Sequence, residues 1–217
     1  MLKYSFMNIA LQMRSLLTSN IFKFLSCVLL TTILVACKPS TQKAGDNVLK
    51  TFATDITGAD FAQTLSLTDH NGKAITLADY EGKIVVLFFG YTHCPDVCPT
   101  TMSDLNLALK KMGDQASQVQ VLFVTLDPVR DTQQILAKYV PSFNKSFIGL
   151  RGSEQQTADT AKNFKIFYSK QAETGKSDYV IDHSAGLYVF DKLGKIKLYI
   201  NYGQKPEEIA HDLTAIM

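Results

Sequence analysis

The chain has 217 residues, of which 46% are hydrophobic and 19% are charged. That is enough for one well-packed domain and too few for two of ordinary size. The 22 basic and 20 acidic residues nearly balance, and no basic stretch is interleaved with aromatic residues. Nucleic acid is therefore not an expected partner.

The N-terminal segment has the pattern of an export signal. Residues 1–36 carry basic residues but no acidic one, and the stretch 24–36 is almost wholly apolar. That stretch is shorter than the roughly 20 residues that span a bilayer, but it fits the core of a signal peptide. The segment ends in a sequence that resembles a bacterial lipobox, Leu34-Val35-Ala36-Cys37.

A lipobox implies cleavage before Cys37 and a lipid on its sulfur, which would hold the protein on a membrane. The alternative is an uncleaved anchor with an incidental cysteine at that position. Both interpretations place the following domain outside the cytoplasm, and we expect the periplasmic side of a bacterial cell envelope.

The four cysteines differ in their expected fates. Cys27 lies in the apolar core of the signal peptide and would be removed with it, while Cys37 would carry lipid. Cys94 and Cys98 remain as free thiols. In an oxidising compartment such a close pair is a disulfide, a redox couple or a metal site.

The elements can be predicted in chain order. Residues 37–57 are polar and aperiodic, as expected of a flexible tether ahead of a folded domain at 58–217. A hairpin around Asn71-Gly72 comes first in that domain. The remaining predicted elements are a buried strand at 84–89, a helix after Pro99, a strand at 119–125, a helix at 132–139, a strand at 147–150, a helix at 154–164, strands at 186–190 and 195–201, and a helix at 207–216.

This order predicts an α/β domain with a central mixed β-sheet flanked by helices and an N-terminal β-hairpin. Right-handed crossovers would place helices on both faces of the sheet. The order of elements resembles the thioredoxin fold, and the two cysteines fall where that fold keeps its active site.

The segment between the cysteines favours a metal site. Pro99 suits the first position of a helix, which would put Cys98 at the cap and Cys94 in the turn before it. Unpaired amides at a helix N-terminus favour thiolates. Three residues separate the cysteines, so the pair can still form a disulfide, but both sulfurs can also face one ion.

The choice of metal follows from the ligand type. Two soft sulfur ligands favour Cu(I), with zinc as the main rival. Structural zinc sites almost always have four ligands, and the chain has no second cysteine pair to complete one. The residues therefore indicate copper over zinc.

A further ligand would have to come from elsewhere, and four histidines are available. His70 and His211 lie in polar surroundings and are expected to be solvated. His93 is adjacent to Cys94, and neighbouring residues rarely share one metal. His183 lies in a polar turn just before a predicted strand, where ligands are common. The pattern alone leaves His183 open between a ligand and a structural histidine.

Asp127 ends the predicted strand 119–125. One interpretation is a capped turn with an ion pair to Arg130, in which Asp131 or Thr132 caps the next helix. The other places Asp127 at the same end of the sheet as the cysteines, as support for the metal ligands or as a partner contact.

Four segments together resemble the Sco/SenC family of copper chaperones, over residues 61–217. They are Phe89-Gly90-Tyr91-Thr92-His93-Cys94-Pro95-Asp96-Val97-Cys98-Pro99-Thr100, Asp127-Pro128-Val129-Arg130-Asp131-Thr132, Phe147-Ile148-Gly149-Leu150 and Asp182-His183-Ser184. The resemblance implies one copper, Cu(I) or Cu(II), per chain, held by Cys94, Cys98 and His183, with Asp127 nearby.

The same resemblance implies a function and partners. The protein would deliver copper to the cytochrome c oxidase subunit that carries the dinuclear copper site. Another periplasmic copper carrier or a thioredoxin-like reductase would be further partners. A thiol–disulfide reductase that keeps the acceptor cysteines reduced, and a copper or redox sensor, stay open as alternatives, with a peroxidase as a weaker one.

Overall fold

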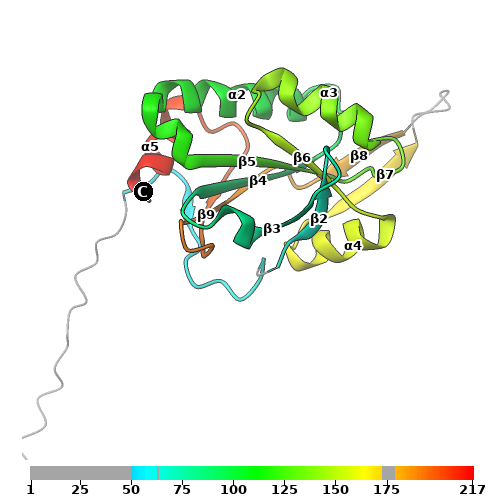
Figure 1. The fold of residues 1–217 in the computed structure, drawn as a ribbon, viewed down its shortest axis with the longest axis horizontal. Helices are drawn as coiled ribbons and strands as arrows, with labels where there is room; N and C mark the ends of the chain where they lie inside the picture. The colour runs from blue at the N-terminus through cyan, green and yellow to red at the C-terminus, as the bar shows by residue number, and fades with distance from the viewer. Residues whose placement is uncertain (1–49, 63, 173–178) are drawn as a thin grey trace, which may run out of the picture. The chain divides into compact units, whose positions relative to one another are not determined.

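The computed structural model describes residues 50–62, 64–172 and 179–217 (Figure 1). The predicted signal peptide, the lipobox and Cys37 lie outside the described residues. Within the described ranges, no helix is both long enough and apolar enough to cross a bilayer.

An eight-stranded mixed sheet forms the centre of the domain, in the order β1-β10-β9-β4-β5-β6-β2-β3. Its central strands β4 (Ile84–Gly90), β5 (Val119–Thr125) and β6 (Ile148–Arg151) run parallel, and the other neighbours pair antiparallel. The outer strands are β1 (Thr54–Asp55), β2 (Ser66–Asp69), β3 (Ala74–Thr76), β9 (Leu187–Phe190) and β10 (Ile196–Ile200). Every residue of β4 and β5 is buried, as expected for strands covered on both faces.

The helices cover the two faces unequally, as Figure 1 shows for α2, α3 and α4. Ile84, Val86 and Phe88 of β4 join a core layer with residues of α2 (Val97–Met112), α3 (Gln133–Phe143) and α5 (Pro206–Ala215). The alternate residues Val85, Leu87 and Phe89 face α4 (Glu154–Asn163) and the segment before β2. The alternation of β4 side chains thus builds two cores, and the predicted thioredoxin-like α/β fold is confirmed.

The predicted N-terminal hairpin is confirmed as β2 and β3, with Gly72 between them at a φ of +91°. The short 3₁₀ helix η2 (Leu77–Tyr80) follows β3 directly. A second 3₁₀ helix, η3 (Gly113–Gln118), links α2 to β5. The strand predicted at 119–125 has the same bounds in the structure, and the helices predicted at 132–139 and 154–164 appear with ends that differ by up to four residues.

The packed domain begins earlier than the expected boundary at residue 58. β1 pairs with β10, and the amides of Phe52 and Ala53 donate to the buried carboxylate of Asp212, at 2.9 and 2.7 Å. These partners lie about 160 positions apart in the chain, so no local pattern reveals them. The segment 52–56 therefore belongs to the folded domain.

A second difference is a two-stranded sheet that the sequence did not predict. β7 (Tyr168–Ala172) and β8 (Tyr179–His183) pair antiparallel and are not hydrogen-bonded to the main sheet. β7 is largely polar and exposed, and β8 has only a short apolar run that ends at the buried Ile181, so neither has the sustained alternation that marks a strand. His183, expected in a turn, is the last residue of β8.

Candidate metal centre

Three side chains from distant segments meet at the carboxyl end of β4. Cys94 lies in the turn after that strand, Cys98 in the first turn of α2, and His183 at the end of β8. Their ligand atoms, two sulfurs and one imidazole nitrogen, all lie within 4.8 Å of one another. The sulfur of Cys98 is 3.5 Å from Nε2 of His183. The group is compact enough to hold one metal ion.

The start of α2 brings the two sulfurs together. The helix begins at Val97, with Asp96 as the residue before it, so the prediction that Cys98 is the cap is wrong by two positions. Asp96 makes no side-chain capping bond. The amide of Cys98 instead donates to the sulfur of Cys94 at 3.4 Å, so this sulfur accepts one of the amides that a helix N-terminus leaves unpaired.

The two thiols differ in burial and in acidity. Cys94 is half-buried, and the thiol of Cys98, the His183 ring and backbone amides together lower its pKa to about 4, with the bond from Cys98 the largest cause. Cys98 is fully buried, and its pKa is raised because its proton is held in the bond to Cys94 and because burial disfavours a charge. The metal-free pair is therefore one thiolate and one thiol.

The ring of His183 is oriented by a contact with its own loop. Its Nδ1 lies 2.9 Å from the backbone oxygen of Ser184. A carbonyl can only accept, so Nδ1 donates to Ser184 and Nε2 is the ring nitrogen that faces the sulfurs. The ring also lies edge-on to Tyr91, with 6.0 Å between centroids.

The loop that carries Cys94 is fixed by Asp131, a residue that the sequence suggested only as a helix cap. Its fully buried carboxylate accepts from the amide and the hydroxyl of Thr92, at 3.0 and 2.5 Å, and from the hydroxyl of Thr125 at 2.5 Å. Thr132 is the cap of α3. The pattern that could have marked Asp131 is its place in the segment that follows β5.

Asp127 is fully buried but is not one of the three grouped side chains. It forms an ion pair with Nε of Arg130 and accepts from the hydroxyl of Tyr179 at 2.8 Å. The Arg130 pair considered from the sequence is therefore present. The expected role of Asp127 beside the metal stays a prediction.

The other histidines have different surroundings. Nδ1 of His70 accepts from the amide of Gly149 at 2.9 Å and is partly buried, so His70 is less solvated than expected. His211 lies beside Asp212, and His93 lies beside Thr92 and Asp131. Within the described residues, none of these three imidazoles joins a group able to hold a metal ion.

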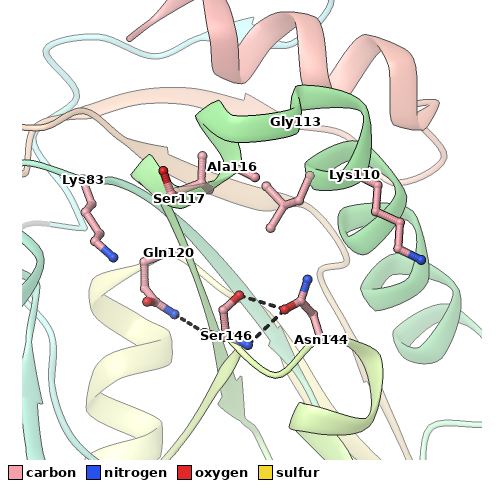
Figure 2. Close-up of a pocket in the computed structure, with 10 residues that line it drawn as sticks. Lys83, Lys110, Gly113, Ala116, Ser117, Gln120, Asn144 and Ser146 are labelled. Carbon is pink, nitrogen blue, oxygen red and sulfur yellow. Dashed lines mark hydrogen bonds between the residues drawn. The ribbon is translucent and has the colours of Figure 1, made fainter.

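A hollow of about 270 Å³ opens onto the site, lined by Tyr91, Cys94, His183 and their neighbours. A larger cavity of about 490 Å³ lies elsewhere, and Figure 2 shows Lys83 and Lys110 at its sides, with the amide of Gln120 bonded to the backbone of Ser146. Its lining contains no cysteine, histidine or carboxylate. The larger cavity therefore offers no ligand for a soft metal, whereas the smaller hollow borders Cys94 and His183.

Fold and site together define a thioredoxin-like domain with a two-sulfur, one-imidazole metal centre. The family model described as SCO1/SenC matches residues 53–217. The chain belongs to the SCO1/SenC family, as the sequence motifs indicated.

Relatives and solved structures agree with this assignment. The protein SCO2 homolog of Bos taurus mitochondria is 36% identical over 154 residues, which cover 70% of this chain and 58% of that one. The structure of Bradyrhizobium japonicum ScoI with copper bound is 37% identical, with a TM-score of 0.65, and the match covers 71% of this chain and 98% of that one. The copper-bound structure of Arabidopsis thaliana ScoI is 31% identical, with a TM-score of 0.66 and coverage of 70% and 96%. The match spans less than two thirds of the first curated relatives' lengths.

Proposed function

We propose that this protein is a membrane-anchored copper chaperone that delivers copper to the dinuclear copper site of cytochrome c oxidase. The observation that carries the proposal is the group of two sulfurs and one imidazole within 4.8 Å. Two solved relatives with the same fold and more than 30% identity contain copper. One copper, as Cu(I) or Cu(II), would bind Cys94, Cys98 and His183.

The ligand set favours copper over zinc. Within the described residues, no fourth cysteine, histidine or carboxylate joins the group, whereas structural zinc almost always has four ligands. Two thiolates and a neutral imidazole suit Cu(I), which accepts low coordination. A site with few ligands also suits a carrier, because a partner's ligands can replace them one at a time.

Copper binding would change the protonation of the pair. The metal takes the place of the proton on Cys98, so binding releases a proton and delivery takes one up. The half-buried Cys94 and His183 border the hollow, so they are open to a partner. Delivery then needs ligand exchange and no change in the oxidation state of copper.

Loading of the purified, reduced chain with copper tests the ligand set. We expect Cys94→Ala, Cys98→Ala and His183→Ala each to abolish stoichiometric copper binding while the circular dichroism spectrum is retained. His93→Ala is the matched control, because its ring is 44% exposed and lies near Asp131 rather than among the ligands. Wild-type Cu(II) affinity and spectrum in His183→Ala would rule out the three-ligand site.

Oxidase assembly separates delivery from disulfide reduction. A reductase needs a thiolate and a resolving thiol but no imidazole. In cells that lack the native chain, His183→Ala should therefore fail to restore oxidase activity if the protein delivers copper. Full restoration by His183→Ala, together with rapid reduction of an oxidised acceptor, would identify the reductase instead.

The anchor is proposed from the sequence. Lipid on Cys37 would hold the domain at the bacterial cell envelope, on the side outside the cytoplasm. We expect the wild-type chain in the membrane fraction and Cys37→Ser to lose incorporation of labelled fatty acid. Unchanged labelling of Cys37→Ser would contradict the lipobox.

A further inference from the structure

A second cluster of charged and aromatic side chains lies between the loop after β5 and the start of β8. Its members are Tyr91, Asp127, Arg130 and Tyr179, which we call the arginine clamp. Arg130 is central, with a side chain only 16% exposed, and it is ion-paired with the fully buried Asp127. Such a buried pair needs a structural or functional reason, since burial of charge is costly.

Arg130 contacts the first residue of β8 by a hydrogen bond and by ring stacking. Its Nη1 donates to the backbone oxygen of Tyr179 at 2.9 Å. Its guanidinium lies 3.6 Å from the centroid of the Tyr179 ring and 5.8 Å from that of Tyr91. The Tyr179 hydroxyl returns to Asp127 at 2.8 Å. Asp127, Arg130 and Tyr179 thus contact one another in a closed cycle, which joins the loop after β5 to the first residue of β8.

Tyr91 extends the cycle toward the metal centre. Its buried hydroxyl accepts from the amide of Ile181, at 3.1 Å, two residues further along β8. Its ring also borders that of His183. Tyr91 lies three residues before Cys94, so one side chain contacts both the cysteine loop and the strand that carries the histidine.

The position of β8 depends on such contacts. Among the described residues, β7 and β8 pair with no strand of the main sheet, and isolated two-stranded hairpins are marginally stable. Ile181 of β8 is buried in the main core, and the clamp adds to that contact. His183 is the last residue of β8, four positions beyond Tyr179. A strand advances about 3.3 Å per residue, so His183 lies within about 13 Å of Tyr179 on the same short strand, and a change in the position of the strand displaces both residues.

We propose that Arg130, held by Asp127, is a positioning residue that fixes β8 so that the imidazole of His183 reaches the two sulfurs. The proposal rests on the three-ligand site described above and assigns Arg130 a role that acts through His183. Arg130 does not touch the metal. It sets the distance between a ligand on the hairpin and two ligands on the α2 side.

Arg130→Lys is the direct test. Lysine keeps the charge but lacks the planar group that donates in two directions and stacks on tyrosine. In the metal-free protein, we expect amide hydrogen exchange along β8 to speed up at least tenfold while exchange in β4 and β5 is unchanged. With Cu(II), we expect at least tenfold weaker binding and a paramagnetic resonance spectrum with reduced nitrogen coupling, shifted toward that of His183→Ala.

Arg151→Lys is the matched control. Arg151 donates to the backbone oxygen of Pro128 in the same loop, and none of its hydrogen bonds within the described residues reaches β8. Arg151→Lys should leave β8 exchange and the Cu(II) spectrum as in wild type. Tyr179→Phe removes only the hydrogen bond to Asp127, so it should speed up β8 exchange and weaken Cu(II) binding by less than Arg130→Lys does. If Arg130→Lys does not fold, Tyr179→Phe is the test.

The outcomes separate this proposal from the ligand assignment. Wild-type β8 exchange and Cu(II) spectrum in Arg130→Lys would overturn the clamp, whatever the role of His183. Faster β8 exchange in Arg130→Lys with no copper binding by the wild-type chain would support the positioning of β8 and overturn the proposed function.

Discussion

At the scale of single residues, the two cysteines have similar sequence surroundings but opposite chemistry. The helix start and the Cys98 thiol act on Cys94, and both stabilise its charged form. Cys98 is buried beside a thiolate, which destabilises its own charged form. The half-buried sulfur of Cys94 is therefore the reactive one, and the buried sulfur of Cys98 keeps its proton until a metal binds.

This difference predicts a pH dependence. With a pKa of about 4 in place of the usual 9.0, Cys94 is already a thiolate above about pH 5, so its alkylation by iodoacetamide should be nearly constant between about pH 5 and pH 8. In Cys98→Ala the largest cause of the lowered pKa is gone, so the pKa rises and the rate should climb with pH. A tenfold rise per pH unit in the wild type would contradict the assignment.

The sequence patterns identified only some of the residues of this site. The cysteine pair and the candidate His183 stand out because few other residue types bind soft metals. The clamp and Asp131 do not stand out, since their bonds to distant segments join residues 39 to 90 positions apart. Arginine, aspartate and tyrosine occur in many surface roles, so nothing local separates a buried network from a solvated one.

At the scale of elements, β4 and α2 approach each other closely at Gly90. A Cβ atom at this residue would lie 2.9 Å from the Cys98 sulfur and 2.9 Å from the Phe123 ring. Both neighbours are fully buried, so neither can move away at low cost. Glycine at the end of β4 thus permits the sulfur of the helix to lie over the strand.

Gly90→Ala should displace the Cys98 sulfur. We expect a loss of stability of about 1–3 kcal/mol from overpacking, together with weaker copper binding. Val86→Ala is the control, because Val86 lies on the same strand and in the same core layer and its truncation leaves the sulfur in place. Urea unfolding and copper titration of both variants make the comparison, and equal copper affinity in Gly90→Ala and wild type would show that the close approach is not needed.

The elements that could be predicted are those with a strong apolar period. β4 and β5 are continuous apolar runs, and α2 has a buried face at helical spacing. β7 and β8 could not be predicted, because β7 is polar and the apolar run of β8 is short. Arg130 and Tyr91, which contact β8, are distant in the sequence. β1 has only two residues and depends on β10 for its conformation.

At the scale of the whole domain, one buried carboxylate joins the first described residues to the last helix. Asp212 of α5 accepts from the amides of Phe52 and Ala53 and from the side chain of Gln204. The segment that leads into the domain is thereby held against α5 and β10. Its attachment is as much a part of the fold as the sheet is.

Asp212→Asn should release this segment. Asparagine keeps one oxygen that accepts hydrogen bonds, but its NH₂ group takes the place of the other oxygen. That NH₂ group faces an N–H donor of the segment and leaves it unpaired, and an unpaired buried group costs about 1–3 kcal/mol. We expect lower stability in urea and faster proteolysis near residue 52, with copper binding unchanged. Asp114→Asn, at an exposed carboxylate in η3, serves as the control, and wild-type proteolysis of Asp212→Asn would disprove the attachment.

The unequal burial of the three ligands has a kinetic consequence under the proposed function. Cys98 has no exposed surface, whereas Cys94 and His183 are each partly open. An incoming thiolate or imidazole from a partner can therefore displace Cys94 or His183 first, and the bond to Cys98 breaks last. The expected intermediate is a copper ion shared between two proteins, still bound to the buried sulfur of the donor while the acceptor already holds its other side.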